Sequence, residues 1–117
     1  MIAVLFEAVA SDAHTHEYFD LAGQLRPLLD EIDGFISIER FESITTPGKV
    51  LSLSFWRDEE AIQAWRRTVA HRKAQAVGRH HVFDDYRLRI AHVVRDYGLN
   101  DRTEAPDDSR EAHGEHG

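Results

Sequence analysis

The stretch FISIERFESITTPGKVLSLSFW, residues 35–56, decides the fold because it predicts a β-hairpin. Two strand-like runs, 35–42 and 49–56, flank the segment 43–48, whose Thr-Thr-Pro-Gly supplies turn-forming residues. Side chains alternate along a strand, so the second run divides into Leu51, Leu53 and Phe55 on one face and Val50, Ser52, Ser54 and Trp56 on the other. One face of this run is therefore wholly apolar, and the other carries two serines.

A helix is expected before the hairpin, from about residue 13 to residue 32. Its apolar side chains recur at helical spacing, at Tyr18, Leu21, Leu25, Leu28, Leu29 and Ile32. Ser11 or Asp12 is the candidate cap, and the Asp-Gly pair at 33–34 would end the helix. Pro27 removes a backbone donor inside the pattern, so we expect a kink or a helix in two pieces.

A second helix is expected after the hairpin. Its first turn holds the acids Asp58, Glu59 and Glu60, which suit the positive end of a helix dipole. The apolar stripe that follows consists of Ala61, Ile62, Trp65 and Val69. Gly78 is the expected end of this helix.

Two outer strands, at residues 2–9 and 86–97, complete the pattern β-α-β-β-α-β. This order predicts an α+β fold of the ferredoxin-like class, with an antiparallel sheet and both helices on one face. The first, third and fourth strands also present apolar side chains on the other face, which a monomer would leave against water. We therefore expect a homodimer in which a partner sheet covers that face.

The composition predicts one globular domain over residues 1–100 and an acidic disordered tail over 101–117. The tail holds six acids and two arginines but no large apolar side chain, so it has little to bury. The net charge of -7 argues against nucleic acid or an anionic membrane as a partner. The chain has no cysteine, no run of about 20 apolar residues and no signal-peptide pattern, and we expect a cytoplasmic protein.

The second half of this pattern resembles the antibiotic biosynthesis monooxygenase family. The cues, in order, are Phe55-Trp56, Glu60-Ala61, Trp65, His71, Gln75, Gly78-Arg79 and Tyr86. In the first half, Ile32-Asp33-Gly34-Phe35 is similar to the family's turn into its second strand. The resemblance covers about residues 1–98 and implies a dimeric α+β barrel, with each protomer's ligand cavity between its sheet and its helices.

Three functions stay open under this resemblance. The leading one is a protein that binds a flat aromatic or other apolar small molecule and oxygenates it without flavin or metal. The second is haem binding or haem degradation, with His71 as the axial ligand. The third is ligand binding without catalysis. The short histidine spacings lack a third ligand, so we expect no structural zinc.

His71 is the first candidate for catalysis, because an imidazole accepts a proton near neutral pH. Trp65 is the second, and with Tyr86 it would position the ring system of a substrate. Six positions separate Trp65 from His71, a turn of about 600° on an unbroken helix. The two side chains share a cavity only if the helix bends around residues 68–70.

Glu7, Ser52 and Ser54 are candidate substrate-binding residues. A carboxylate in the apolar first strand costs free energy unless it is paired or faces an open cavity. Glu7 either lines the cavity or forms a salt bridge with an arginine of the last strand. In the oxygenase relatives an asparagine commonly points into the cavity from this strand, so Glu7 departs from that pattern. The two serines either supply polar groups to a pocket wall or face a partner strand.

Cations gather after the second helix, at Arg66, Arg67, Arg72, Lys73 and Arg79. A solvated charged face is the first interpretation of this cluster. The alternative is contact with the carboxylates of haem or of an acidic substrate.

Overall fold

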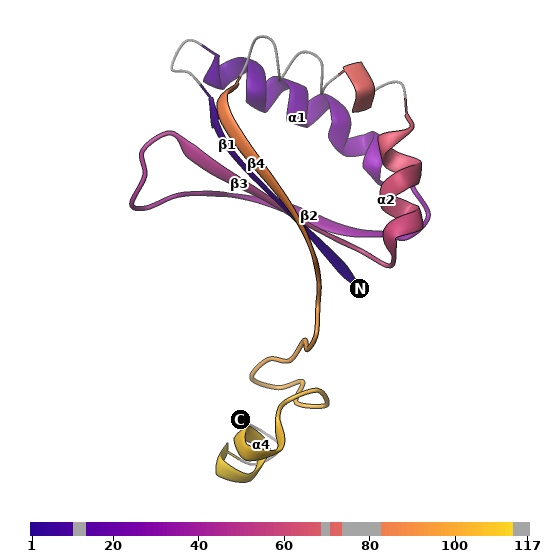
Figure 1. Cartoon of the computed structure of the whole chain (residues 1–117), viewed down its shortest axis with the longest axis vertical. Coiled ribbons are helices and arrows are strands. Elements are labelled where there is room, and N and C mark those ends of the chain that lie inside the picture. The colour runs from indigo at the N-terminus through magenta and orange to yellow at the C-terminus, as the bar shows by residue number, and fades with distance from the viewer. Residues whose placement is uncertain (11–13, 69–70, 74–82, 114–117) are drawn as a thin grey trace.

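The computed structural model describes residues 1–10, 14–68, 71–73 and 83–113. These form an antiparallel sheet of order β2-β3-β1-β4 with α1 and α2 against one face (Figure 1). The sequential elements are β1 (Ile2–Ala10), α1 (Thr15–Leu29), β2 (Phe35–Glu42), β3 (Lys49–Trp56), α2 (Glu59–Arg66) and β4 (Phe83–His92). The expected ferredoxin-like α+β arrangement is confirmed, and both strands of the hairpin have the predicted bounds.

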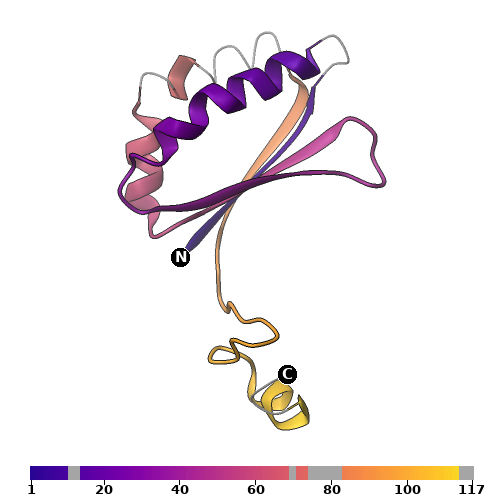
Figure 2. The same ribbon diagram turned by 180° about the vertical axis from the view of Figure 1, so that it is seen from behind.

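The register of β1 fixes which side chains share a face. Val4 lies opposite Ser54 of β3 and Ile90 of β4, so these three are on one face, while Leu5 and Leu53 are on the other. The helices cover the first of these faces, where Val50, Ser52, Ser54 and Trp56 are all buried. No helix of the described ranges covers the second face, which we call the open face (Figure 2).

Helix α1 differs from its prediction at both ends. It runs through Pro27 as one helix to Leu29, so the expected division into two pieces is wrong. Pro27 lies only two residues from the end, where few further backbone bonds depend on it. The expected caps Ser11 and Asp12 fall outside the described residues, and the observed N-cap residue, His14, makes no side-chain cap bond.

Helix α2 begins as predicted. The Asp58 carboxylate accepts a hydrogen bond from Ala61 N at 2.9 Å, which caps the helix. Ala61, Ile62 and Trp65 are buried against a core that includes Ile2 and Trp56. Val69 and Gly78 of the expected helix lie outside the described residues.

Gly34 lets the chain enter β2 close beside α2. Its φ of 93° is in the left-handed region that glycine adopts without strain. A Cβ added there would lie 2.8 Å from Cβ of Ala61. The turn into β2 therefore requires glycine on both conformational and steric grounds.

Strand β4 occupies Phe83–His92 instead of the expected 86–97. Its partner sets these limits, because the ladder runs from Ala10 opposite Phe83 to Ile2 opposite His92. Beyond His92, the backbone amide of Val93 donates one further hydrogen bond to Met1 O, at 3.1 Å. Apolar alternation continues to 97, but β1 has ended.

The tail extends away from the sheet and contains a short helix, α4 (Asp107–His113) (Figure 1). Hydrogen bonds within the described part of the tail are local, such as the one from Arg102 Nη2 to Ser109 Oγ at 2.6 Å. The expectation of a disordered tail over residues 101–117 stays a prediction. The domain boundary near residue 100 stays a prediction. Within the described ranges, no helix is long and apolar enough to cross a membrane.

Candidate functional site

Thr68 builds a bend directly after α2. Its hydroxyl donates to Trp65 O at 2.8 Å and accepts from His71 N at 3.1 Å. Arg72 N bonds Thr68 O at 3.1 Å, and residues 71–73 are helical again. Helix α2 itself ends at Arg66. The expected break between Trp65 and His71 is therefore confirmed. The Thr68 hydroxyl bonds the last turn of α2 on one side and the first residue of the turn 71–73 on the other.

The bend brings Trp65 and His71 together. Their ring centroids are 5.2 Å apart with the planes at 54°. Trp65 is 8% exposed and belongs to the core, whereas His71 is half-buried. Among the described residues, Nδ1 of His71 is buried without a hydrogen-bond partner. The two side chains thus form a contact that a straight helix excludes.

Burial lowers the pKa of His71 below its ordinary value, because the charged imidazolium loses hydration. The backbone of Arg66 opposes this shift by accepting a hydrogen bond, and the positive charge of Arg66 adds to it. The neutral imidazole is therefore favoured near pH 7. A neutral histidine is able to accept a proton.

Ser54 lies on the same face as this pair. Its Oγ accepts a hydrogen bond from Trp56 Nε1 at 2.9 Å, and Trp56 belongs to the same core cluster as Trp65. Ser52, two residues before Ser54 in β3, is also buried and pairs with Phe6 of β1. Both serines face the helices of their own chain, so the alternative of facing a partner strand does not fit.

Tyr86 belongs to a separate aromatic cluster toward the other end of that face. The cluster joins Phe6 to Phe83 at 5.4 Å between centroids, Phe6 to Tyr86 at 5.6 Å, and Tyr18 to Phe83 at 5.3 Å. In the described part of the chain, no ring contact joins Tyr86 to Trp65 or His71.

The hydroxyl of Tyr18 is a polar group that the sequence did not single out. It is buried and has no hydrogen-bond partner among the described residues. Its position in the apolar stripe of α1 favoured a core role, and the only available signal was a tyrosine in a series otherwise made of aliphatic residues.

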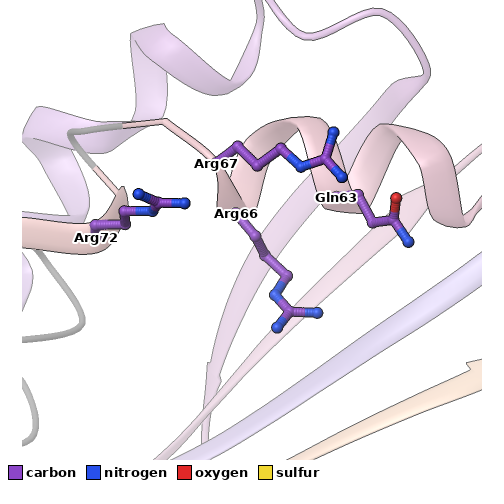
Figure 3. Close-up of a pocket in the computed structure, with 4 residues that line it drawn as sticks. All are labelled: Gln63, Arg66, Arg67 and Arg72. Carbon is purple, nitrogen blue, oxygen red and sulfur yellow. The ribbon is translucent and has the colours of Figure 1, made fainter.

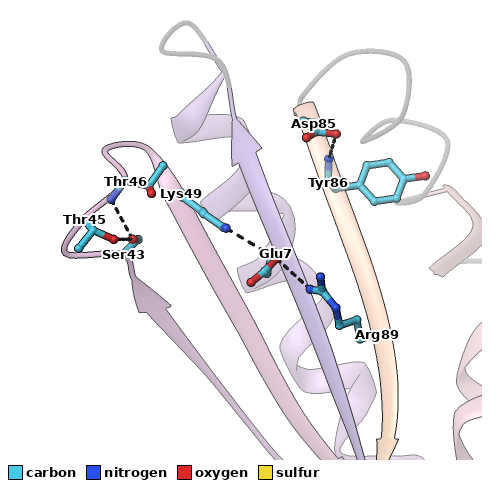
Figure 4. Close-up of polar contacts among 8 residues, drawn as sticks. All are labelled: Glu7, Ser43, Thr45, Thr46, Lys49, Asp85, Tyr86 and Arg89. Carbon is cyan, nitrogen blue, oxygen red and sulfur yellow. Dashed lines mark hydrogen bonds and ion pairs between the residues drawn. The ribbon is translucent and has the colours of Figure 1, made fainter.

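Glu7 lies on the open face, away from Trp65, His71 and both serines. Its Oε2 lies 3.1 Å from Arg89 Nη1 and 3.7 Å from Lys49 Nζ (Figure 4). The hydrogen bond from Arg89 is the main reason that the pKa of Glu7 is lowered. The salt bridge to an arginine of the last strand is confirmed, and the structure does not bring Glu7 together with the other candidates.

A hollow of about 370 Å³ lies beside the bend (Figure 3). It is lined by Gln63, Arg66, Arg67 and Arg72, all with exposed side chains. Trp65 and His71 are not among these lining residues. The cavity expected to be bordered by both stays a prediction.

The geometry defines a ferredoxin-like α+β domain with a histidine held against a tryptophan at a helix bend. Residues 1–77 match the family model described as Antibiotic biosynthesis monooxygenase. The chain belongs to this family.

Two relatives support the assignment. Jasmonate monooxygenase ABM of Pyricularia oryzae is 44% identical over 101 residues, which cover 86% of this chain and 47% of that protein. The chain thus spans about half the length of this relative. The uncharacterized protein YqjZ of Bacillus subtilis is 30% identical over 93 residues, covering 80% of this chain and 79% of YqjZ.

Solved structures support the fold. A putative antibiotic biosynthesis monooxygenase from Deinococcus radiodurans has a TM-score of 0.75 at 16% identity, covering 85% of this chain and 98% of that one. Rv0793 from Mycobacterium tuberculosis has a TM-score of 0.74 at 13% identity, covering 83% of this chain and 98% of that one.

Proposed function

We propose that this protein is a monooxygenase that acts on an apolar small molecule, with His71 as the general base. The observation that carries the proposal is the Nδ1 atom of His71, which is buried beside the Trp65 ring without a hydrogen-bond partner among the described residues. A buried acceptor without a partner is costly unless a function retains it. The name of the Pyricularia oryzae relative supports oxygenation as that function.

The proposed chemistry starts from the neutral, half-buried imidazole of His71. His71 takes a proton from a CH2 group next to a carbonyl of the substrate, and the resulting carbanion passes one electron to O2. The carbon radical and superoxide join as a peroxide anion, which the protonated His71 then protonates. Loss of water from this hydroperoxide leaves one oxygen atom in the product as a carbonyl. In this sequence of steps, which the resemblance implies, no flavin or metal takes part.

Aromatic side chains on the helix-covered face of the sheet support an apolar substrate. Phe6, Tyr18, Phe83 and Tyr86 form a continuous set of aromatic contacts there. Along β4 the set continues in Leu88 and Ile90, which are 50% and 45% exposed. Flat or alicyclic molecules pack against such side chains through apolar contact. The buried Tyr18 hydroxyl adds one group for hydrogen bonding.

Oxygen uptake in the presence of jasmonate tests the proposal. We expect uptake by the purified protein and a fall of about 100-fold or more in H71Q, the usual effect of losing a general base. R95Q is the control, because Arg95 is exposed and lies beyond the end of β4. Equal uptake in H71Q and the unchanged protein would remove His71 as the base, and no uptake would remove the oxygenase.

Haem binding is the alternative function that the resemblance implies. His71 would be the axial ligand, and the arginines beside the bend would suit the propionates. The name of the Pyricularia oryzae relative favours the oxygenase instead. A Soret band on addition of haem, absent in H71A, would reverse this conclusion.

The proposal includes a homodimer formed through the open face. Leu5, Leu51, Leu53 and Phe55 are only partly buried there, and Phe41 is 42% exposed. Apolar surface of this kind is stabilised by a second copy of the sheet. The Glu7 ion pairs with Arg89 and Lys49 would then lie within the interface.

A further inference from the structure

Three arginines line the hollow at the bend. Arg66 and Arg67 come from the C-terminal end of α2, and Arg72 comes from the helical turn 71–73 (Figure 3). Gln63, one turn earlier on α2, completes the lining with a side-chain amide. Like charges around one hollow repel each other, and an anion between them would offset that repulsion.

The three arginines of the hollow form no ion pair with any of the described residues, unlike three other arginines of the chain. Arg26 and Arg89 have carboxylate oxygens at 2.6 and 3.1 Å. Arg57 has two such oxygens, at 3.2 and 2.9 Å. Arg40, Arg87 and Arg95 also have no ion pair within the described ranges, so the shared hollow is what sets Arg66, Arg67 and Arg72 apart. In a protein of net charge -7, acids are plentiful, yet none of the described ones neutralises this cluster.

Helix dipoles explain part of the arrangement only. Arg66 and Arg67 lie at the negative C-terminal end of α2, where cations are stabilising. Arg72 lies outside α2, in the helical turn 71–73, so the α2 dipole does not account for its position. An anion in the hollow would offset the repulsion among the three guanidinium groups.

We propose that this hollow binds the carboxylate of an anionic substrate through Arg67 and Arg72, with Arg66 and Gln63 beside them. Guanidinium groups bind carboxylates in a bidentate manner that neutral esters do not reproduce. The inference rests on the proposed function, because it supplies the charged end of the apolar substrate. The site adjoins His71, whose own electrostatics include the charge of Arg66.

Calorimetric titration with jasmonate and methyl jasmonate tests the site, since the two probes differ in the charge of one group. We expect the intact protein to bind jasmonate at least about tenfold more tightly than the ester. In R67Q/R72Q the ratio should fall to nearly one, while the affinity for the ester stays unchanged. The control R95Q/R102Q removes the same charge from the segment after β4 and should keep the preference.

Equal affinity for the two probes, binding of neither, or a preference that survives in R67Q/R72Q would overturn the proposal. Displacement of jasmonate by equimolar inorganic phosphate would overturn the assignment to a carboxylate. Oxygen uptake on the same samples separates this site from the oxygenase. A binding preference for jasmonate without oxygen uptake would support the carboxylate site and contradict the oxygenase proposal. Oxygen uptake with either probe but no binding preference would support the oxygenase and contradict the carboxylate site.

Discussion

The rings of Trp65 and His71 lie with their centroids 5.2 Å apart, although six positions separate the two residues. Thr68 makes this possible by bonding Trp65 O and His71 N with one hydroxyl. A break in a helix thus creates the contact on which the proposed chemistry depends.

Removing the Thr68 hydroxyl should loosen this contact. We expect T68A to lose about 1 kcal/mol of unfolding free energy, the usual cost of a lost N-cap, and T68S to retain it. Urea denaturation of the two variants measures the difference. If T68A and T68S are equally stable, the hydroxyl does not hold the bend.

His71 should make the protein less stable in mild acid. Its folded-state pKa is lowered by burial, so below about pH 6.5 the unfolded chain binds a proton that the folded chain resists. Stability is therefore complete above that pH and falls as pH drops toward the folded-state pKa. Denaturation curves of the unchanged protein and H71Q should diverge over this window. Parallel curves would contradict a lowered pKa.

Gly34 and Gly48 offer a matched pair for the turn into β2. Both have positive φ, but an added Cβ lies 2.8 Å from Ala61 Cβ at Gly34 and meets nothing within 4 Å at Gly48. We expect G48A to cost about 1–2 kcal/mol from backbone strain alone and G34A to cost clearly more. Thermal unfolding compares them, and equal losses would show that the contact with α2 is unimportant.

A charge at the centre of the open face should prevent dimer formation. Leu53 lies between Leu5 and Glu39 in the sheet, so L53D would place a carboxylate inside the proposed interface. We expect the dimer dissociation constant to rise at least about 100-fold by sedimentation, since an unpaired buried charge costs several kcal/mol. I44D is the control, because Ile44 is 100% exposed. An unchanged protein that sediments as a folded monomer would contradict the dimer.

Local patterns predicted the elements whose limits depend on nearby residues. The hairpin has its predicted bounds because alternation and turn chemistry lie within residues 35–56. The end of β4 was missed because β1, far away in the sequence, stops pairing at Ile2. Alternation alone continues past His92 and gives no sign of this limit.

The sequence predicted which residues of the candidate site could come together, but not the backbone geometry that brings them together. The sequence showed that Trp65 and His71 meet only if the helix bends around residues 68–70, but the role of Thr68 in that bend depends on backbone geometry. Side-chain alternation placed Glu7 on the opposite face of β1 from Phe6 and Ala8. Only the assembled fold, however, shows which of the two faces the helices cover. The convergence of Arg66, Arg67 and Arg72 likewise depends on the direction of the chain after the bend.

Incubation of the purified protein with jasmonate under ¹⁸O2, followed by immediate quenching and mass spectrometry of the product, tests whether the protein is an oxygenase that uses His71. We expect a product that contains one ¹⁸O atom, formed at least about 100-fold more slowly by H71Q. A product without ¹⁸O, or an equal rate in H71Q, would contradict it.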